Sequence, residues 1–163
     1  MNTDVESTSR GQILQVLEAT APYTGDDFFQ HLTLALSHAC GTRWAFVSEL
    51  LIDTSRVRLV SCSQDDEEMG VWECDVAGTP CAQTVVAGRT AYEANVAQLF
   101  PDDVGINKNN IQAFVAISLK AASGDAIGIC GVSHDKPLPI GPIVALMDEV
   151  APRALVCLVQ VRP

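Results

Sequence analysis

Two cysteines are the residues of this sequence best placed to do chemistry. Cys74 and Cys81 lie on either side of Gly78-Thr79-Pro80 and could approach each other in the folded chain. Thr79 followed by Pro80 is typical of a helix start, so Cys81 would lie in the first turn, where the helix dipole favours a thiolate. The pair could therefore form a thiol redox switch. The alternative is that Cys81 is a small buried side chain that packs the helix on a sheet.

The remaining polar residues indicate no metal site and no catalytic machinery. The six cysteines show no CxxC or CxxH spacing. His31 and His38 are too far apart to ligate one metal from a single helical face, and we expect both to face solvent. His134 stands beside Asp135 at the end of an apolar run, where it would line a pocket or cap a turn, with a surface position favoured. We therefore expect a protein that is not an enzyme.

Composition favours one folded domain. The chain has 163 residues, of which 48% are hydrophobic and 18% charged. We expect a single domain over residues 1–163, with residues 1–10 disordered and a core over residues 26–159. The net charge of -10 disfavours nucleic acid and anionic membranes as partners, because neutralising phosphate requires clustered Lys and Arg.

The sequence has neither a membrane span nor a targeting signal that we can identify. No apolar run reaches 18 residues, and the first residues lack the basic and apolar regions of a signal peptide. We expect a cytoplasmic protein whose cysteines are reduced and mostly buried.

The first half of the chain predicts two helices followed by strands. Ile13, Leu14 and Leu17 indicate a first helix, and apolar residues at helical spacing over residues 28–39 indicate a second, with Ser37 facing outwards. Residues 44–52 and 56–62 are rich in β-formers and are separated by Asp53-Thr54-Ser55, which predicts a hairpin.

The middle of the chain predicts short elements. Residues 65–68 are acidic and predict a solvated loop, and a strand is expected over residues 71–76. A two-turn helix should run from Pro80 to a terminating Gly88. A strand over residues 90–93, a single helical turn after Asn95 and a loop over residues 102–112 complete this part.

The last third of the chain predicts an apolar hairpin and a helix. Residues 113–120 and 126–134, joined by Ser123-Gly124-Asp125, should form the centre of the sheet. Gly128 and Gly131 suggest close packing by a helix. A final helix should run from Pro142 to residue 159, kinked or interrupted at Pro152. The whole order predicts an α/β (α+β) fold with a mainly antiparallel sheet.

Two segments carry a resemblance to a known family. Residues 74–88, with the Gly-Thr-Pro-Cys helix start, followed by Leu99-Phe100-Pro101-Asp102, resemble GAF domains of bacterial sensor kinases and other signalling proteins, including two-component systems. The hairpin of residues 113–128 is similar to the central strands of that family, and the likeness covers residues 26–159.

The resemblance implies a fold and a regulatory function. It implies a six-stranded, mainly antiparallel sheet with terminal helices on one face and a ligand cavity on the other. It implies a sensory domain that binds an unidentified small molecule, or that signals by forming a homodimer through its terminal helices, and that passes the signal to an output domain such as a kinase or cyclase. No cofactor is indicated. The residues expected to enclose the ligand are Trp72, Cys74, Cys81, Tyr92 and Phe114.

Three branches of the family can be compared with this sequence. The cyclic-nucleotide branch has an Asn-Lys, Phe, Asp-Glu signature, of which this chain has Asn107-Lys108 and Phe114 but not the Asp-Glu. The bilin-binding branch attaches its chromophore to a cysteine usually next to a histidine, and no cysteine here has that neighbour. A third branch reduces free methionine sulfoxide through cysteines that form a disulfide, and the alternative function is such an enzyme, or a redox switch, using Cys74 and Cys81.

Overall fold

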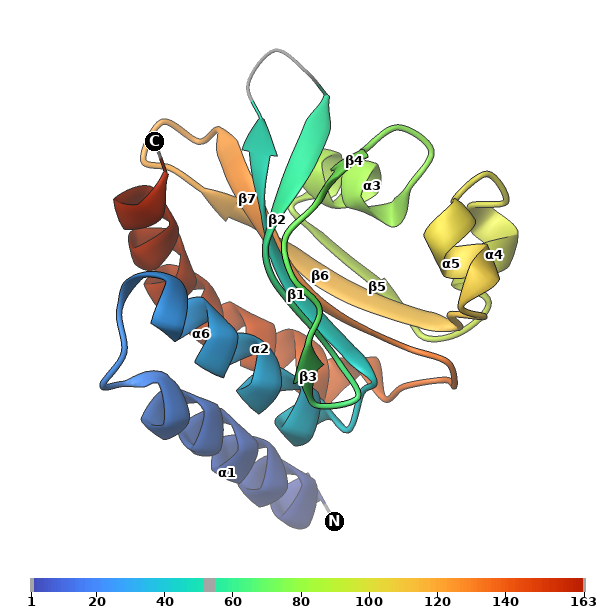
Figure 1. Cartoon of the computed structure of the whole chain (residues 1–163). Helices are drawn as coiled ribbons and strands as arrows, with labels where there is room; N and C mark the ends of the chain where they lie inside the picture. Colours follow the sequence, from blue (N-terminus) through green and yellow to red (C-terminus); the bar gives the residue numbers. More distant parts are fainter. Residues whose placement is uncertain (1, 52–54, 163) are drawn as a thin grey trace.

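The computed structural model of the protein describes residues 2–51 and 55–162, with side chains from residue 10 onwards. Three helices, α1 (Asn2–Thr20), α2 (Gly25–Cys40) and α6 (Ile140–Val161), lie on one face of an antiparallel sheet (Figure 1). Three short helices, α3 (Pro80–Ala87), α4 (Val96–Leu99) and α5 (Val104–Lys108), lie on the other face. The expectation that the terminal helices lie on one face of the sheet and the middle helices on the other is therefore confirmed.

The sheet is six strands wide. Its order is β3 (Glu67–Glu68), β2 (Arg56–Gln64), β1 (Trp44–Leu51), β7 (Ala126–His134), β6 (Ala113–Lys120) and β5 (Arg89–Tyr92). A seventh strand, β4 (Glu73–Asp75), pairs with β2 on the edge that β3 also occupies. All pairings are antiparallel.

Some expectations about the sheet need correction. The centre is formed by β1 and β7, while β6 lies one strand further out, next to β5. The acidic segment is exposed as expected, but Glu67 and Glu68 also pair with the edge of β2. The hairpin between β1 and β2 is present; Asp53 and Thr54 of its expected turn lie outside the described residues.

A β-bulge in β2 decides which of its side chains face the cavity side of the sheet. The register with β1 shifts between Val47, which pairs with Ser61, and Ser48, which pairs with Leu59, so that Val60 is the extra residue. An extra residue reverses the alternation of side chains. Val57 and Leu59 therefore face the same side as Cys62 and Gln64.

The same bulge turns two serines of β2 towards α2. Ser61 Oγ lies 3.0 Å from Thr33 Oγ1, and Ser63 Oγ lies 3.2 Å from Ser37 Oγ, all four side chains being buried. Ser37 thus faces the sheet, contrary to the expectation of an outward position. The reason is that a buried hydroxyl is tolerated wherever a partner hydroxyl satisfies it.

Helix α1 begins at Asn2. The other helices differ from the sequence-based expectations in two places. α6 is continuous through Pro152, because Ala154, Cys157 and Leu158 beyond it are buried against the sheet and offset the lost hydrogen bond. α5 replaces the loop expected over residues 102–112, because the Asp103 carboxylate caps it.

Two separate apolar clusters fill the two sides of the sheet. The larger cluster joins α1, α2 and α6 to strands β1, β6 and β7, with Phe28, Phe29, Leu32 and Leu36 of α2 almost completely buried. The smaller cluster lies under α3, α4 and α5 and contains Trp44 and Phe114. Burial of the larger cluster stabilises the fold, and the smaller cluster surrounds the candidate site.

Candidate functional site

A cavity of about 340 Å³ lies on the face of the sheet that carries α3 and α5. Its floor is the sheet, because β1 presents every second side chain, Trp44, Phe46 and Ser48, to this face. Val57, Leu59, Cys62 and Gln64 of β2, Phe114 of β6 and Ser133 of β7 extend the floor. The site therefore depends on the bulge of β2 as well as on strand alternation.

The walls come from the segment around β4 and from α3 and α5. Met69, Trp72 and Cys74 belong to the chain between β2 and α3, and Pro80 and Cys81 begin α3. The side chains of Met69 and Trp72 are 45% and 43% exposed. Large apolar side chains that remain exposed at the edge of an apolar cavity are typical of a binding surface.

Helix α5 forms the remaining wall because polar side chains fix its start. Asp103 Oδ1 accepts a hydrogen bond of 3.0 Å from the Ile106 backbone N–H, which caps the helix. The Asn107 side-chain amide donates to the carbonyl oxygens of Phe100 at 3.1 Å and Asp103 at 2.8 Å. Ile106 is consequently buried at the cavity wall, together with Ile111 just beyond the helix.

Four of the five residues expected to enclose a ligand line this cavity. They are Trp72, Cys74, Cys81 and Phe114. Tyr92 pairs with Phe114 across β5 and β6, but its ring packs edge-on against Phe100, with 5.7 Å between ring centroids, and it does not line the cavity. Phe100, which follows α4, covers Tyr92.

Several lining residues were missed by the sequence analysis. The alternation Trp44-x-Phe46-x-Ser48 was a usable signal, because two aromatic residues and a serine share one face of a strand. For Asp103 and Ile106, the sequence contained only a weak indication of a capped helix, namely an aspartate three residues before an apolar side chain. The β2 residues depend on the bulge, for which the sequence gives no signal.

The two candidate cysteines are protonated rather than activated. All six cysteines are free thiols. Burial raises the pKa of Cys81 to about 12, and desolvation, with the nearby Asp103 carboxylate, raises the pKa of Cys74. The expectation of a thiolate at the start of α3 is therefore wrong. Desolvation raises the pKa of Cys81 by more than the helix dipole lowers it.

The histidines have structural partners. His38 Nε2 lies 2.7 Å from Asp66 Oδ1 at the surface, and the His31 ring, partly buried, stacks on Tyr23 with 3.5 Å between centroids. His134 Nδ1 accepts a hydrogen bond of 3.1 Å from the Arg43 backbone N–H, so it caps the chain entering β1. Among the side chains that the structure describes, no group of three His, Cys, Asp or Glu residues could hold a metal ion.

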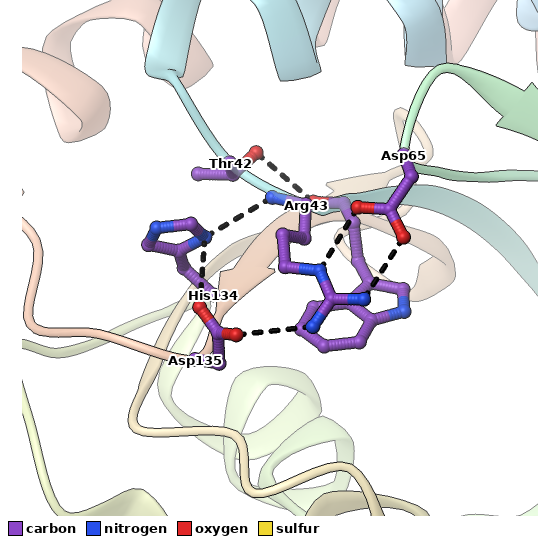
Figure 2. A network of polar contacts seen from close by, with 6 residues as sticks. Thr42, Arg43, Asp65, His134 and Asp135 are labelled. Carbon is purple, nitrogen blue, oxygen red and sulfur yellow. Dashed lines mark hydrogen bonds and ion pairs between the residues drawn. The ribbon is translucent and has the colours of Figure 1, made fainter.

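Next to Trp44, Arg43 joins three segments of the chain (Figure 2). Its guanidinium donates to both oxygens of Asp65, each at 2.9 Å, and to Asp135 Oδ2 at 3.0 Å. It also lies 4.7 Å from the centroid of the Trp44 ring. Arg43 lowers the pKa of both carboxyl groups. The network therefore fixes the position of Trp44, which lines the cavity.

This network predicts an acid-dependent contribution to stability. Because the pKa values of Asp65 and Asp135 are lowered in the folded protein, their contribution is present above the unfolded-state pKa of about 3.9 and is lost as pH falls through the folded values. Arg43→Ala should lower the urea midpoint at pH 7, and the difference from the parent should shrink below about pH 4.

The matched variant for this measurement is Arg43→Lys, which keeps the charge but cannot bind Asp65 with two parallel hydrogen bonds. Its urea midpoint at pH 7 should lie between those of the parent and Arg43→Ala. A deficit of Arg43→Ala that stays constant from pH 7 to pH 3 would show that loss of packing, and not the ion pairs, causes the change.

The fold has well-defined structural relatives. The GAF domain of a phosphoenolpyruvate-protein phosphotransferase from Coxiella burnetii aligns with a TM-score of 0.76 at 8% identity, covering 94% of both chains. A GAF sensor protein from Burkholderia vietnamiensis gives 0.73 at 11% identity, covering 95% of this chain and 96% of the other. The free methionine-R-sulfoxide reductase from Neisseria meningitidis, solved with its substrate, gives 0.72 at 13% identity over 93% and 90%.

No protein-family model matches the sequence, and no curated protein is significantly similar to it. The structural similarity nevertheless covers 93–95% of this chain in these three structures. The chain therefore has the GAF domain fold, an α+β fold with a six-stranded antiparallel sheet and flanking helices. Within the described residues, no helix combines the length and the apolar character needed to span a bilayer.

Proposed function

We propose that this chain is a regulatory domain that binds a small molecule in the cavity between the sheet and α3–α5. The observation that carries the proposal is the cavity itself, which has an apolar floor and an exposed apolar rim of Met69 and Trp72. Ligand sites are typically concave and mostly apolar, with a few polar groups. A bound molecule would cover the rim and stabilise the segment that contains β4.

Strand β1 offers a physical route from the ligand to the terminal helices. Trp44, Phe46 and Ser48 line the cavity, whereas Ala45 and Val47, which alternate with them, belong to the core beneath α2 and α6. A ligand that favours one position of β1 would thus shift the packing of the helices on the opposite face. The proposed output is a change in those helices that reaches a dimer partner and an output domain such as a kinase or cyclase.

Three large apolar side chains of the terminal helices are exposed and could take part in a homodimer interface. Leu14 of α1 is 57% exposed, and Val156 and Val159 of α6 are 54% and 56% exposed. Ile13, next to Leu14 in α1, is partly buried and packs against the core. The proposed interface therefore uses Leu14, Val156 and Val159, and an interface between identical chains requires a self-complementary surface of this kind.

Native mass spectrometry of freshly purified protein tests this function. We expect a dimer that carries a non-covalently bound small molecule, and a shift to monomer for the double variant Leu14→Glu/Val156→Glu. Trp44 and Trp72, the two tryptophans of the sequence, both line the cavity, so release of the molecule should change the intrinsic fluorescence. A monomer at high concentration that retains nothing and binds nothing would contradict the proposal.

A second candidate function is thiol chemistry, because Cys74 and Cys81 line the same cavity. Two thiols could reduce a sulfoxide to a thioether and water, each thiol losing one hydrogen as the disulfide forms. The raised pKa values of both thiols do not favour this chemistry, because the thiolate is the nucleophile.

Thiol mass spectrometry decides between the two candidates. We expect the parent to be alkylated slowly at Cys81, because its pKa is raised to about 12 and little thiolate is present at neutral pH. We also expect no loss of two hydrogen masses on mild oxidation. Formation of a Cys74–Cys81 disulfide, absent in Cys74→Ser, together with sulfoxide reduction by the parent, would instead establish the thiol function.

A further inference from the structure

One hydroxyl in the floor of the cavity makes no hydrogen bond. Ser48 is fully buried, and its Oγ is the single buried side-chain N or O atom without a partner among the described residues. An unsatisfied buried hydroxyl destabilises a fold, and such groups often mark a site whose partner is a ligand. Ser48 lies on β1 at the position where the register with β2 shifts. The hydroxyl is thus held in place by the sheet.

The cavity contains no cation that could balance a negatively charged ligand. Its described lining residues include one carboxylate, Asp103, and no Lys, Arg or His. The guanidinium of the nearby Arg43 lies 4.7 Å from the centroid of the Trp44 ring and is paired with both Asp65 and Asp135. Burying an anion without a partner is costly.

The size and shape of the cavity suit a flat aromatic molecule. An engineered apolar cavity of about 150 Å³ binds one benzene molecule, and this cavity measures about 340 Å³. Trp44, Phe46, Trp72 and Phe114 line it, and the Phe46 and Phe114 rings lie 5.8 Å apart at an interplanar angle of 31°. Aromatic rings in such arrangements favour stacked or edge-on contacts with a further ring.

We propose that the cavity takes an uncharged aromatic molecule of about two fused rings, with one hydrogen-bonding substituent that reaches Ser48 Oγ. This inference rests on the proposed function and names the chemical class of its ligand. The rings occupy the space between the aromatic side chains, and the substituent satisfies the Ser48 hydroxyl. Anionic analogues, including phosphorylated and carboxylated ones, are disfavoured, because the described lining residues include no Lys, Arg or His.

Three probes with the same ring system test the class of ligand. They are naphthalene, 1-naphthol and 1-naphthoate, titrated into the purified full chain, freed of retained ligand, by isothermal titration calorimetry at pH 7. We expect 1-naphthol to bind about three- to tenfold more tightly than naphthalene, as one net hydrogen bond predicts. We expect 1-naphthoate to bind at least about tenfold more weakly than 1-naphthol, because its carboxylate stays unpaired.

Two variants test the role of Ser48. Ser48→Ala should remove the preference for 1-naphthol over naphthalene and leave naphthalene binding unchanged. Its melting temperature should stay the same or rise, because the variant removes an unsatisfied group. The control is Ser133→Ala, whose side chain also lines the cavity, and which should keep the preference. A preference lost in Ser133→Ala and kept in Ser48→Ala would overturn the assignment to Ser48.

The remaining outcomes are equally decisive. Binding of 1-naphthoate as tight as that of 1-naphthol would overturn the preference for uncharged molecules. Protein that retains a small molecule after purification but binds none of the three probes would overturn the aromatic class and leave the proposed function intact. Protein that retains nothing and binds none of them would contradict both.

Discussion

Replacing Gly131 with alanine is expected to destabilise the protein by about 1–3 kcal/mol, the range typical of overpacking in a dense core. A Cβ at this position would lie 2.8 Å from Ala116 Cβ, from Phe46 Cζ and from the Val115 backbone oxygen. All three atoms belong to β1 and β6, the two strands that flank β7 in the sheet and cannot move independently of it. Because Phe46 lines the cavity, the variant should also weaken ligand binding. The measurement is urea unfolding at pH 7.

Two further glycine variants provide the comparison. Gly128→Ala should be destabilising as well, because its Cβ would meet Leu158 of α6 and lie 2.6 Å from the Ser48 backbone oxygen. Gly11→Ala is the control, because nothing lies within 4 Å of the new methyl group and alanine favours a helix by about 1 kcal/mol over glycine. Equal effects for Gly131→Ala and Gly11→Ala would show that close packing does not determine the cost.

The second large effect is expected at Glu49, whose side chain is only 5% exposed and is paired with Arg58 on β2. Arg162, which follows α6, lies 3.9 Å from the same carboxylate. Arg58→Ala should lower the free energy of unfolding by roughly 3 kcal/mol, because removing one partner leaves a buried charge uncompensated. Urea or thermal unfolding at pH 7 measures this loss.

The double variant Glu49→Met/Arg58→Met separates the charge effect from simple loss of contacts. It removes both charges and keeps apolar volume, so it should be more stable than Arg58→Ala. If the double variant is as unstable as Arg58→Ala, the carboxylate is not the cause. A comparison with Arg162→Ala shows whether the more distant guanidinium also stabilises Glu49; we expect a smaller loss there, because 3.9 Å is beyond a direct hydrogen bond.

Local sequence signals predicted most of the elements of this fold. The helical spacing of Phe28, Phe29, Leu32 and Leu36 predicted α2, because a helix on a sheet needs one continuous apolar face. Thr79-Pro80 and Gly88 correctly predicted both ends of α3, where Gly88 adopts a left-handed conformation with φ 85°. These signals act within a few residues and do not depend on the rest of the fold.

Expectations failed where a partner distant in the sequence decides the outcome. The burial of Ser37 depends on Ser63, which only the folded sheet brings near. The pKa of Cys81 depends on what covers the start of α3, so the helix dipole alone predicted the wrong direction. The continuity of α6 through Pro152 depends on the apolar core beneath the helix.

The sequence by itself therefore determined the class of fold and the order of its elements, because periodicity, caps and turns are local properties. The four expected residues that line the cavity were implied by the resemblance to GAF domains. The tertiary structure decided how the cavity is built. The bulge at Val60 selects which β2 side chains enter it, Phe100 removes Tyr92 from it, and the packing around β1 leaves Ser48 Oγ without a partner. Each of these depends on contacts between segments far apart in the chain, which no local pattern specifies.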